Sequence, residues 1–119
     1  MSISIYYTAR RPQPITKEEA ALCRQIADRY DAQYPYGELY EGFCIYDLEK
    51  DRDEWEQDVI FSGATKLPLE APPFLFQIAN WQLNCLEEIS NILPGAQWHV
   101  HLDDLDLEWT EEERFRFPE

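Results

Sequence analysis

Hydrophobic and polar residues alternate near the start of the chain. Ile3, Ile5 and Tyr7 alternate with Ser2, Ser4 and Tyr6. A period of two residues is typical of a β-strand with one buried face. Pro12 and Pro14 end this predicted strand.

The period then changes to that of an amphipathic helix. Thr16 followed by Glu19 is the signature of a capping box, with Ile15 and Ala20 spaced for a hydrophobic staple. The pattern predicts a helix from this cap to about Tyr34. Its apolar stripe contains Leu22, Cys23, Ile26, Ala27, Tyr30 and Tyr34.

Two further strands are predicted in the middle of the chain. Residues 43–46 form a short aromatic strand, and a third strand begins at residues 59–61. Ser62-Gly63 and Pro68 are expected to close this third strand or to introduce a bulge.

A second helix is predicted between two proline-containing segments. It opens at Pro72 and Pro73, which suit a first helical turn, and it ends at Pro94-Gly95. A strand over residues 96–102 follows. The broad stripe on this helix predicts deep burial and contains Leu75, Ile78, Ala79, Trp81, Cys85, Leu86, Ile89, Ile92 and Leu93.

The phase of the alternation jumps at Asp103-Asp104, which predicts a two-residue hairpin turn there. The alternative is a bulge in one longer strand. The hairpin pairs apolar residues on the core face and histidines with carboxylates on the opposite face. The predicted pairs are Leu102 with Leu105, Val100 with Leu107, Trp98 with Trp109, His101 with Asp106 and His99 with Glu108.

The order of predicted elements is strand, helix, strand, strand, helix, strand. This order is typical of an α+β fold with an antiparallel sheet of four to five strands and two helices on one face. It matches the split βαβ order of ferredoxin-like folds, with a C-terminal hairpin added. We expect one domain over residues 1–119.

Composition and charge then restrict the classes of function that the chain could have. Aromatic residues make up 14% of the chain, which is typical of a folded protein and not of an acidic disordered tail. The net charge of −14 argues against direct binding to nucleic acid, because phosphates require Lys and Arg partners. The same charge attracts basic proteins, although many acidic proteins carry such charge only to remain dispersed.

Sequence features that would indicate secretion, a membrane or a cofactor are missing. We find no signal peptide and no apolar stretch of membrane-spanning length, so we expect a cytoplasmic protein. Cys23, Cys44 and Cys85 match neither a disulfide framework nor a zinc site, and each lies in an apolar segment. We find no P-loop, no GxSxG and no GxGxxG motif, so we expect no enzyme activity and no cofactor.

One cluster keeps an enzyme alternative open. His99 and His101, with Asp106 and Glu108 on the same strand face, could hold a divalent metal or supply a general base. The simpler interpretation is a set of exposed cross-strand pairs with no catalytic role.

Candidate partner-binding residues follow from the distribution of charge and aromatic side chains. Two acidic blocks span residues 47–58 and 103–113. Trp55 lies within the first block, and Tyr36 and Tyr40 flank another acidic segment, so they could stack on cationic side chains of a partner. The binding residues that we predict are Asp51, Asp53, Glu54, Trp55, Glu56, Asp58, Tyr36, Tyr40, Asp103, Asp104, Asp106 and Glu108.

Residues 63–68 and 93–101, together with Tyr7-Thr8-Ala9-Arg10-Arg11, resemble a group of small bacterial immunity proteins. That group belongs to polymorphic toxin systems, including contact-dependent growth inhibition. The resemblance implies a protein that binds a cognate basic toxin, such as a nuclease, and covers its substrate cleft. It implies no particular binding residue. The other interpretation is a general acidic adaptor for some other basic protein.

Overall fold

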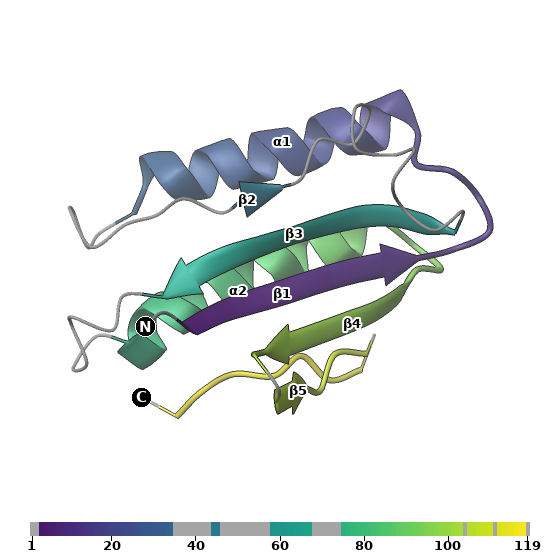
Figure 1. Cartoon of the computed structure of the whole chain (residues 1–119). Helices are drawn as coiled ribbons and strands as arrows, with labels where there is room; N and C mark the ends of the chain where they lie inside the picture. The colour runs from purple at the N-terminus through teal and green to yellow at the C-terminus, as the bar shows by residue number, and fades with distance from the viewer. Residues whose placement is uncertain are drawn as a thin grey trace.

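The computed structural model describes residues 3–34, 44–45, 58–67, 75–103, 105–110 and 112–118 (Figure 1). The chain forms two helices and five strands in these ranges. Their bounds are β1 (Ile3–Arg10), α1 (Lys17–Ala32), β2 (Cys44–Ile45), β3 (Val59–Leu67), α2 (Leu75–Ile92), β4 (Gln97–Leu102) and β5 (Leu105–Leu107).

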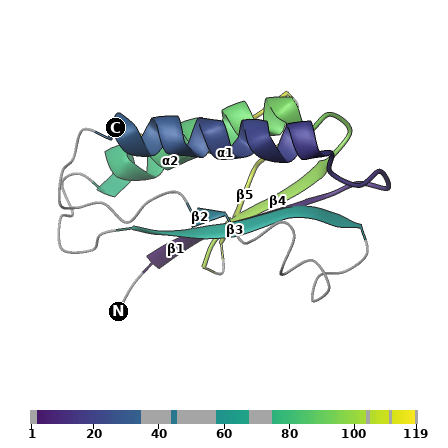
Figure 2. The same ribbon diagram turned by 90° about the horizontal axis from the view of Figure 1, so that it is seen from above.

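The five strands form one sheet in the order β2-β3-β1-β4-β5. Every neighbouring pair is antiparallel. Figure 2 shows α1 and α2 together on one side of this sheet. The fold is therefore α+β, with an antiparallel sheet and two helices.

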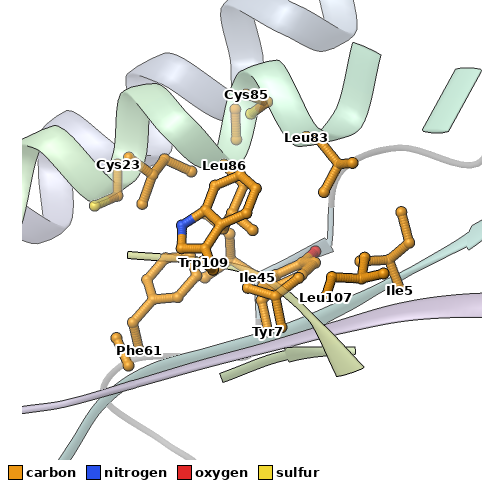
Figure 3. Close-up of a cluster of buried hydrophobic side chains, with 14 of the residues drawn as sticks. Ile5, Tyr7, Cys23, Ile45, Phe61, Leu83, Cys85, Leu86, Leu107 and Trp109 are labelled. Atoms are coloured by element: carbon orange, nitrogen blue, oxygen red, sulfur yellow. The ribbon is translucent and has the colours of Figure 1, made fainter. Parts of the chain in front are cut away.

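Alternate residues of β1 point towards the helices. Ile5, Tyr7 and Ala9 are buried, whereas Tyr6 lies on the face that the helices leave uncovered. The Tyr7 hydroxyl hydrogen-bonds the Thr65 hydroxyl at 3.1 Å, which satisfies a polar group inside the core. Figure 3 shows the core between the helices and the sheet, where Ile5, Tyr7, Cys23, Ile45, Phe61, Leu83, Cys85, Leu86, Leu107 and Trp109 meet.

The capping box at the start of α1 is confirmed. The Glu19 backbone N–H donates to the Thr16 hydroxyl, and the Thr16 N–H donates to the Glu19 carboxylate. Cys23 and Ala27 of the predicted stripe are buried, but Leu22 is exposed, so its predicted burial is wrong. Ile26, Tyr30 and Tyr34 of the stripe are partly buried against the core, and the helix packs against α2.

Arg11 ties the start of α1 to the end of α2. Its guanidinium is buried and bonds both carboxylate oxygens of Glu19. It also donates to the backbone carbonyls of Gln13, Pro14 and Pro94, at 2.9, 3.1 and 3.2 Å. The burial of Arg11 is not predicted by the sequence, because nothing in its neighbours marks it as buried.

Because Glu19 pairs with Arg11, the stability of the fold depends on the ionisation of the Glu19 carboxyl. The hydrogen bonds from Arg11, opposed by partial burial, hold the pKa of the Glu19 carboxyl below its usual range. A carboxyl with a lowered folded-state pKa stabilises the fold above its unfolded pKa, which is about 4.3, and loses that contribution as the pH falls through the folded value.

We therefore expect Glu19→Gln to lower the free energy of unfolding by about 2 kcal/mol at pH 7 and by much less at pH 3. Urea unfolding at both pH values measures this difference. Glu18→Gln is the matched control, because Glu18 is exposed in the same helical turn. If the free energy of unfolding fell by the same amount between pH 7 and pH 3 in the wild type and in Glu19→Gln, the proposed contribution of Glu19 would be contradicted.

The third strand is longer than predicted. β3 continues through Ser62-Gly63 and ends at Leu67, directly before Pro68, so the predicted closure is wrong at Ser62-Gly63 and agrees with the structure at Pro68. Gly63 lies opposite Tyr7 of the central strand, and the antiparallel ladder with β1 continues through both residues. The irregularity lies earlier, where Ile60 is the extra residue between two registered pairs.

The second helix agrees with its predicted deep burial. Ile78, Ala79, Leu86 and Ile89 face the core and are buried, together with the polar Asn80, Gln82 and Ser90. The predicted start at Pro72 and Pro73 lies outside the described residues. Gly95 follows the helix with φ of 78°, a left-handed conformation that glycine adopts without strain.

The last described residues pack along α2. The side-chain amide of Asn80 donates to the Phe117 carbonyl and accepts from the Phe117 N–H, both at 2.8 Å. Phe117 also stacks on Phe76. The Arg116 guanidinium bonds Asn84 and pairs with Glu87 at 3.2 Å. This C-terminal segment (residues 112–118) is therefore an integral part of the helical layer.

Candidate functional site

Exposed carboxylates gather where the sheet ends at β5 and in the turn that follows. Asp103, Asp106, Glu108, Glu112 and Glu113 are all exposed. We call these five residues the β5 acidic edge. Three of them belong to the predicted binding set, whereas Asp104 lies outside the described residues.

Local hydrogen bonds shape this edge. Asp103 adopts a left-handed φ of 48° between β4 and β5, and its carbonyl accepts a 2.7 Å hydrogen bond from Nδ1 of His101. Beyond β5, the backbones of Thr110 and Glu113 close a turn, and the Phe115 N–H donates to the Glu108 carbonyl. The acids therefore lie in the turns at the two ends of β5 and along the strand between them.

The predicted hairpin is confirmed, and the alternative of one bulged strand is wrong. Val100 lies opposite Leu107 and Leu102 opposite Leu105. Two other predictions need correction. Leu105 is 58% exposed because it lies at the rim of the core, and Trp109 forms its bridge with Arg114 instead of pairing with Trp98.

The predicted register of His101 with Asp106 is confirmed, whereas the predicted pair of His99 with Glu108 is wrong. Nε2 of His99 lies 2.9 Å from Oδ1 of Asp106, so His99 contacts Asp106 and not the predicted Glu108. His101 is in register with Asp106, but its ring bonds the Asp103 carbonyl. The two imidazoles stack on each other, and His101 stacks on Tyr6. These contacts form a ladder of rings on the uncovered face of the sheet.

The histidine cluster is small. In the described ranges, no group of three or more His, Cys, Asp or Glu side chains lies close enough together to hold a metal ion. Among the described residues, Asp106 is the one side chain of ligand type that contacts His99 or His101.

Within the part of the chain that the structure describes, most carboxylates of the β5 acidic edge have no cationic partner. Asp103, Glu108, Glu112 and Glu113 form no ion pair with any residue in the described ranges. Asp106 contacts His99, but its side chain is still 80% exposed. Four arginines, in contrast, form ion pairs within the fold: Arg10 with Asp58, Arg11 with Glu19, Arg29 with Glu88 and Arg116 with Glu87.

The first acidic block is described at one position only. Asp58 is exposed and pairs with Arg10 at 2.8 Å, so its charge is partly neutralised within the fold. The other predicted binding residues of this block and the tyrosines lie outside the described residues. They are Asp51, Asp53, Glu54, Trp55, Glu56, Tyr36 and Tyr40.

A cleft of about 730 Å³, which no pattern in the sequence predicts, lies between the end of α2 and the C-terminal hairpin. Its lining includes Trp98, Trp109, Thr110 and Arg114. Trp109 donates from its indole N–H to the Ser90 hydroxyl at 2.9 Å, which fixes one wall. The spacing of the two tryptophans predicted their common face, but nothing in the sequence predicted that Arg114 would join them.

A second hollow, of about 460 Å³, lies between the helices. The Glu88 carboxylate there accepts hydrogen bonds from Arg29 and from the Tyr30 hydroxyl. Burial and the bond to Glu88 raise the pKa of Tyr30. Burial also acts to raise the pKa of Glu88, but the two hydrogen bonds outweigh it and hold that pKa below its usual range. These bonds join α1 to α2.

Cys23 and Cys85 are buried free thiols, as their apolar surroundings predict. Burial, with a smaller effect from Glu19, raises the pKa of Cys23 to about 12. Burial also raises the pKa of Cys85. Such thiols are poor nucleophiles because the thiolate is scarce near neutral pH.

Comparison with protein families, curated proteins and solved structures finds no match. Neither helix in the described ranges is long and apolar enough to cross a bilayer.

Proposed function

We propose that this protein is an immunity protein that binds a basic toxin and covers its substrate-binding cleft. The observation that carries the proposal is the β5 acidic edge, where four of five carboxylates lack a counter-charge in the described ranges. A partner with clustered Lys and Arg would supply those charges. The proposed site of action is the cytoplasm, and the proposed toxin is a nuclease.

The proposed mechanism is electrostatic capture followed by occlusion. A nuclease cleft is basic because it holds phosphates, and carboxylates on a folded edge offer charge-assisted hydrogen bonds to the same side chains. The net charge of −14 would accelerate encounter with a basic partner at low ionic strength. No catalytic step is required of the immunity protein itself.

We further propose that the fold has ferredoxin-like, split βαβ order with β5 appended. Two observations support this. β1 and β2, which α1 connects, are separated in the sheet by β3. β3 and β4, which α2 connects, are separated in the same way by β1.

The test begins with recovery of the partner. The untagged protein would be purified from its own cells with the neighbouring genes intact, and bound proteins would be released by a salt step. We expect one stoichiometric basic protein with nuclease activity, which the immunity protein inhibits. A preparation without a basic partner, from cells shown to express the neighbouring genes, would overturn the proposal.

The location of the interface is tested by two variants of equal net charge. Glu108→Gln/Glu112→Gln removes two charges from the β5 acidic edge, and Glu18→Gln/Asp28→Asn removes two exposed charges from α1. We expect the first variant to associate about 10-fold more slowly at low salt, because steering depends on where the charges lie. The second should stay within about twofold of the wild type.

Stopped-flow association at several salt concentrations measures this effect. Because both variants change the net charge equally, a difference between them reports the position of the contact. Equal slowing of both variants would remove the β5 acidic edge from the interface.

A further inference from the structure

The cleft between α2 and the C-terminal hairpin contains an arginine that pairs with no carboxylate of the described residues. Arg114 is half-buried, and no carboxylate in the described ranges lies within ion-pair distance of it. The other arginines that are at least partly buried, Arg10, Arg11 and Arg116, each pair with a carboxylate. A half-buried arginine without a carboxylate partner is unusual in a chain with 24 acidic residues.

The hydrogen bonding of Arg114 is also incomplete. Its Nε is buried and has no hydrogen-bond partner in the described structure. One terminal nitrogen reaches the Asn91 side-chain oxygen only at 3.5 Å, which is a weak contact. The guanidinium lies over the Trp109 ring at 6.0 Å, which orients it. A buried N–H without an acceptor carries a free-energy cost, and the terminal N–H groups, with their weak contact to Asn91, remain available to an incoming acceptor.

The walls of the cleft set the shape and chemistry of such an acceptor. The half-buried Trp98 indole offers a flat apolar surface, and Asn91, Gln97 and Thr110 provide neutral polar groups. The volume of about 730 Å³ lies within the range of small-molecule sites.

We propose that this cleft binds a small aromatic carboxylate. The planar guanidinium of Arg114 matches a carboxylate through two parallel N–H···O bonds, and the ring of the ligand lies against Trp98. A singly charged carboxylate fits better than a phosphate dianion, because the surrounding net charge of −14 repels the second charge. This inference does not depend on a toxin partner.

Fluorine NMR of the 5-fluorotryptophan-labelled protein, titrated with benzoate to about 20 mM, tests the inference at the weak affinities expected for so small a ligand. We expect saturable shifts of the Trp98 and Trp109 signals, each assigned with a Trp→Phe variant. Trp81, which lines the hollow between the helices, should not shift and serves as the internal reference. No saturable shift of the Trp98 signal would overturn the proposal.

The contribution of charge is tested in two ways. Benzamide has nearly the shape of benzoate without its charge, and we expect it to bind the wild type at least about 10-fold more weakly. Arg114→Met should weaken benzoate binding by a similar factor, whereas the exposed Arg24→Met should leave it unchanged. Equal affinities for benzoate and benzamide would overturn the carboxylate assignment, even if Arg114→Met failed to fold.

Discussion

Arg11→Met should lower the free energy of unfolding by about 3–5 kcal/mol, the cost typical of breaking a buried ion pair by removing one partner. The side chain of Arg11 is only 6% exposed, and it donates to one carboxylate and three backbone carbonyls. Methionine fills much of the same volume but offers no donors. Those carbonyls and Glu19 would each lose a donor that the Arg11 guanidinium supplies.

Urea unfolding monitored by circular dichroism measures the effect. Arg24→Met is the matched control because Arg24 is exposed on the surface of α1, and it should unfold like the wild type. Arg11→Lys should be intermediate, since one ammonium group does not reproduce the planar fork. A loss below about 1 kcal/mol for Arg11→Met would show that the network behaves as a surface ion pair.

Trp109→Ala should lower the free energy of unfolding by a similar amount, about 3–5 kcal/mol. The Trp109 side chain is part of the core, and the residue is 6% exposed. Its ring lies beneath the guanidinium groups of both Arg114 and Arg116. The substitution leaves a large cavity and removes the surface on which the C-terminal segment rests.

The conservative variant separates packing from hydrogen bonding. Trp109→Phe keeps an aromatic ring and loses the bond to Ser90, so it should cost about 1–2 kcal/mol. Ser90 keeps its bond to the Leu86 carbonyl, so no buried donor is stranded. Similar losses for Trp109→Ala and Trp109→Phe would contradict a packing role for the indole.

Features that depend on neighbouring residues were predictable from the sequence. The capping box is set by Thr16 and Glu19 alone, and the β4–β5 hairpin follows from the jump in alternation between Leu102 and Leu105. In both cases the local pattern and the tertiary environment favour the same structure.

Features that depend on distant neighbours were not predictable. The β3 strand continues through Gly63 because Gly63 pairs with Tyr7 of β1, and the ladder between β1 and β3 extends beyond this pair in both directions. The burial of Arg11 depends on the Pro94 carbonyl, which lies 83 residues away. Leu105 has the pattern of a core residue, yet it lies at the rim of the sheet. In the candidate site, the acidic residues were predicted from the charge of the sequence. The cleft at Arg114 was not predicted, because it forms where three separate segments of the chain meet.

The middle position of β1 determines when the sheet can form during synthesis. β1 leaves the ribosome before the other described elements, but its two neighbours are β3 and β4, which follow much later. Pairing over such sequence separations requires costly loop closure and slows folding. α1 can form early with its local cap, whereas β1 must wait with both edges unpaired. The nascent chain is therefore most prone to misassociation until β4 has emerged.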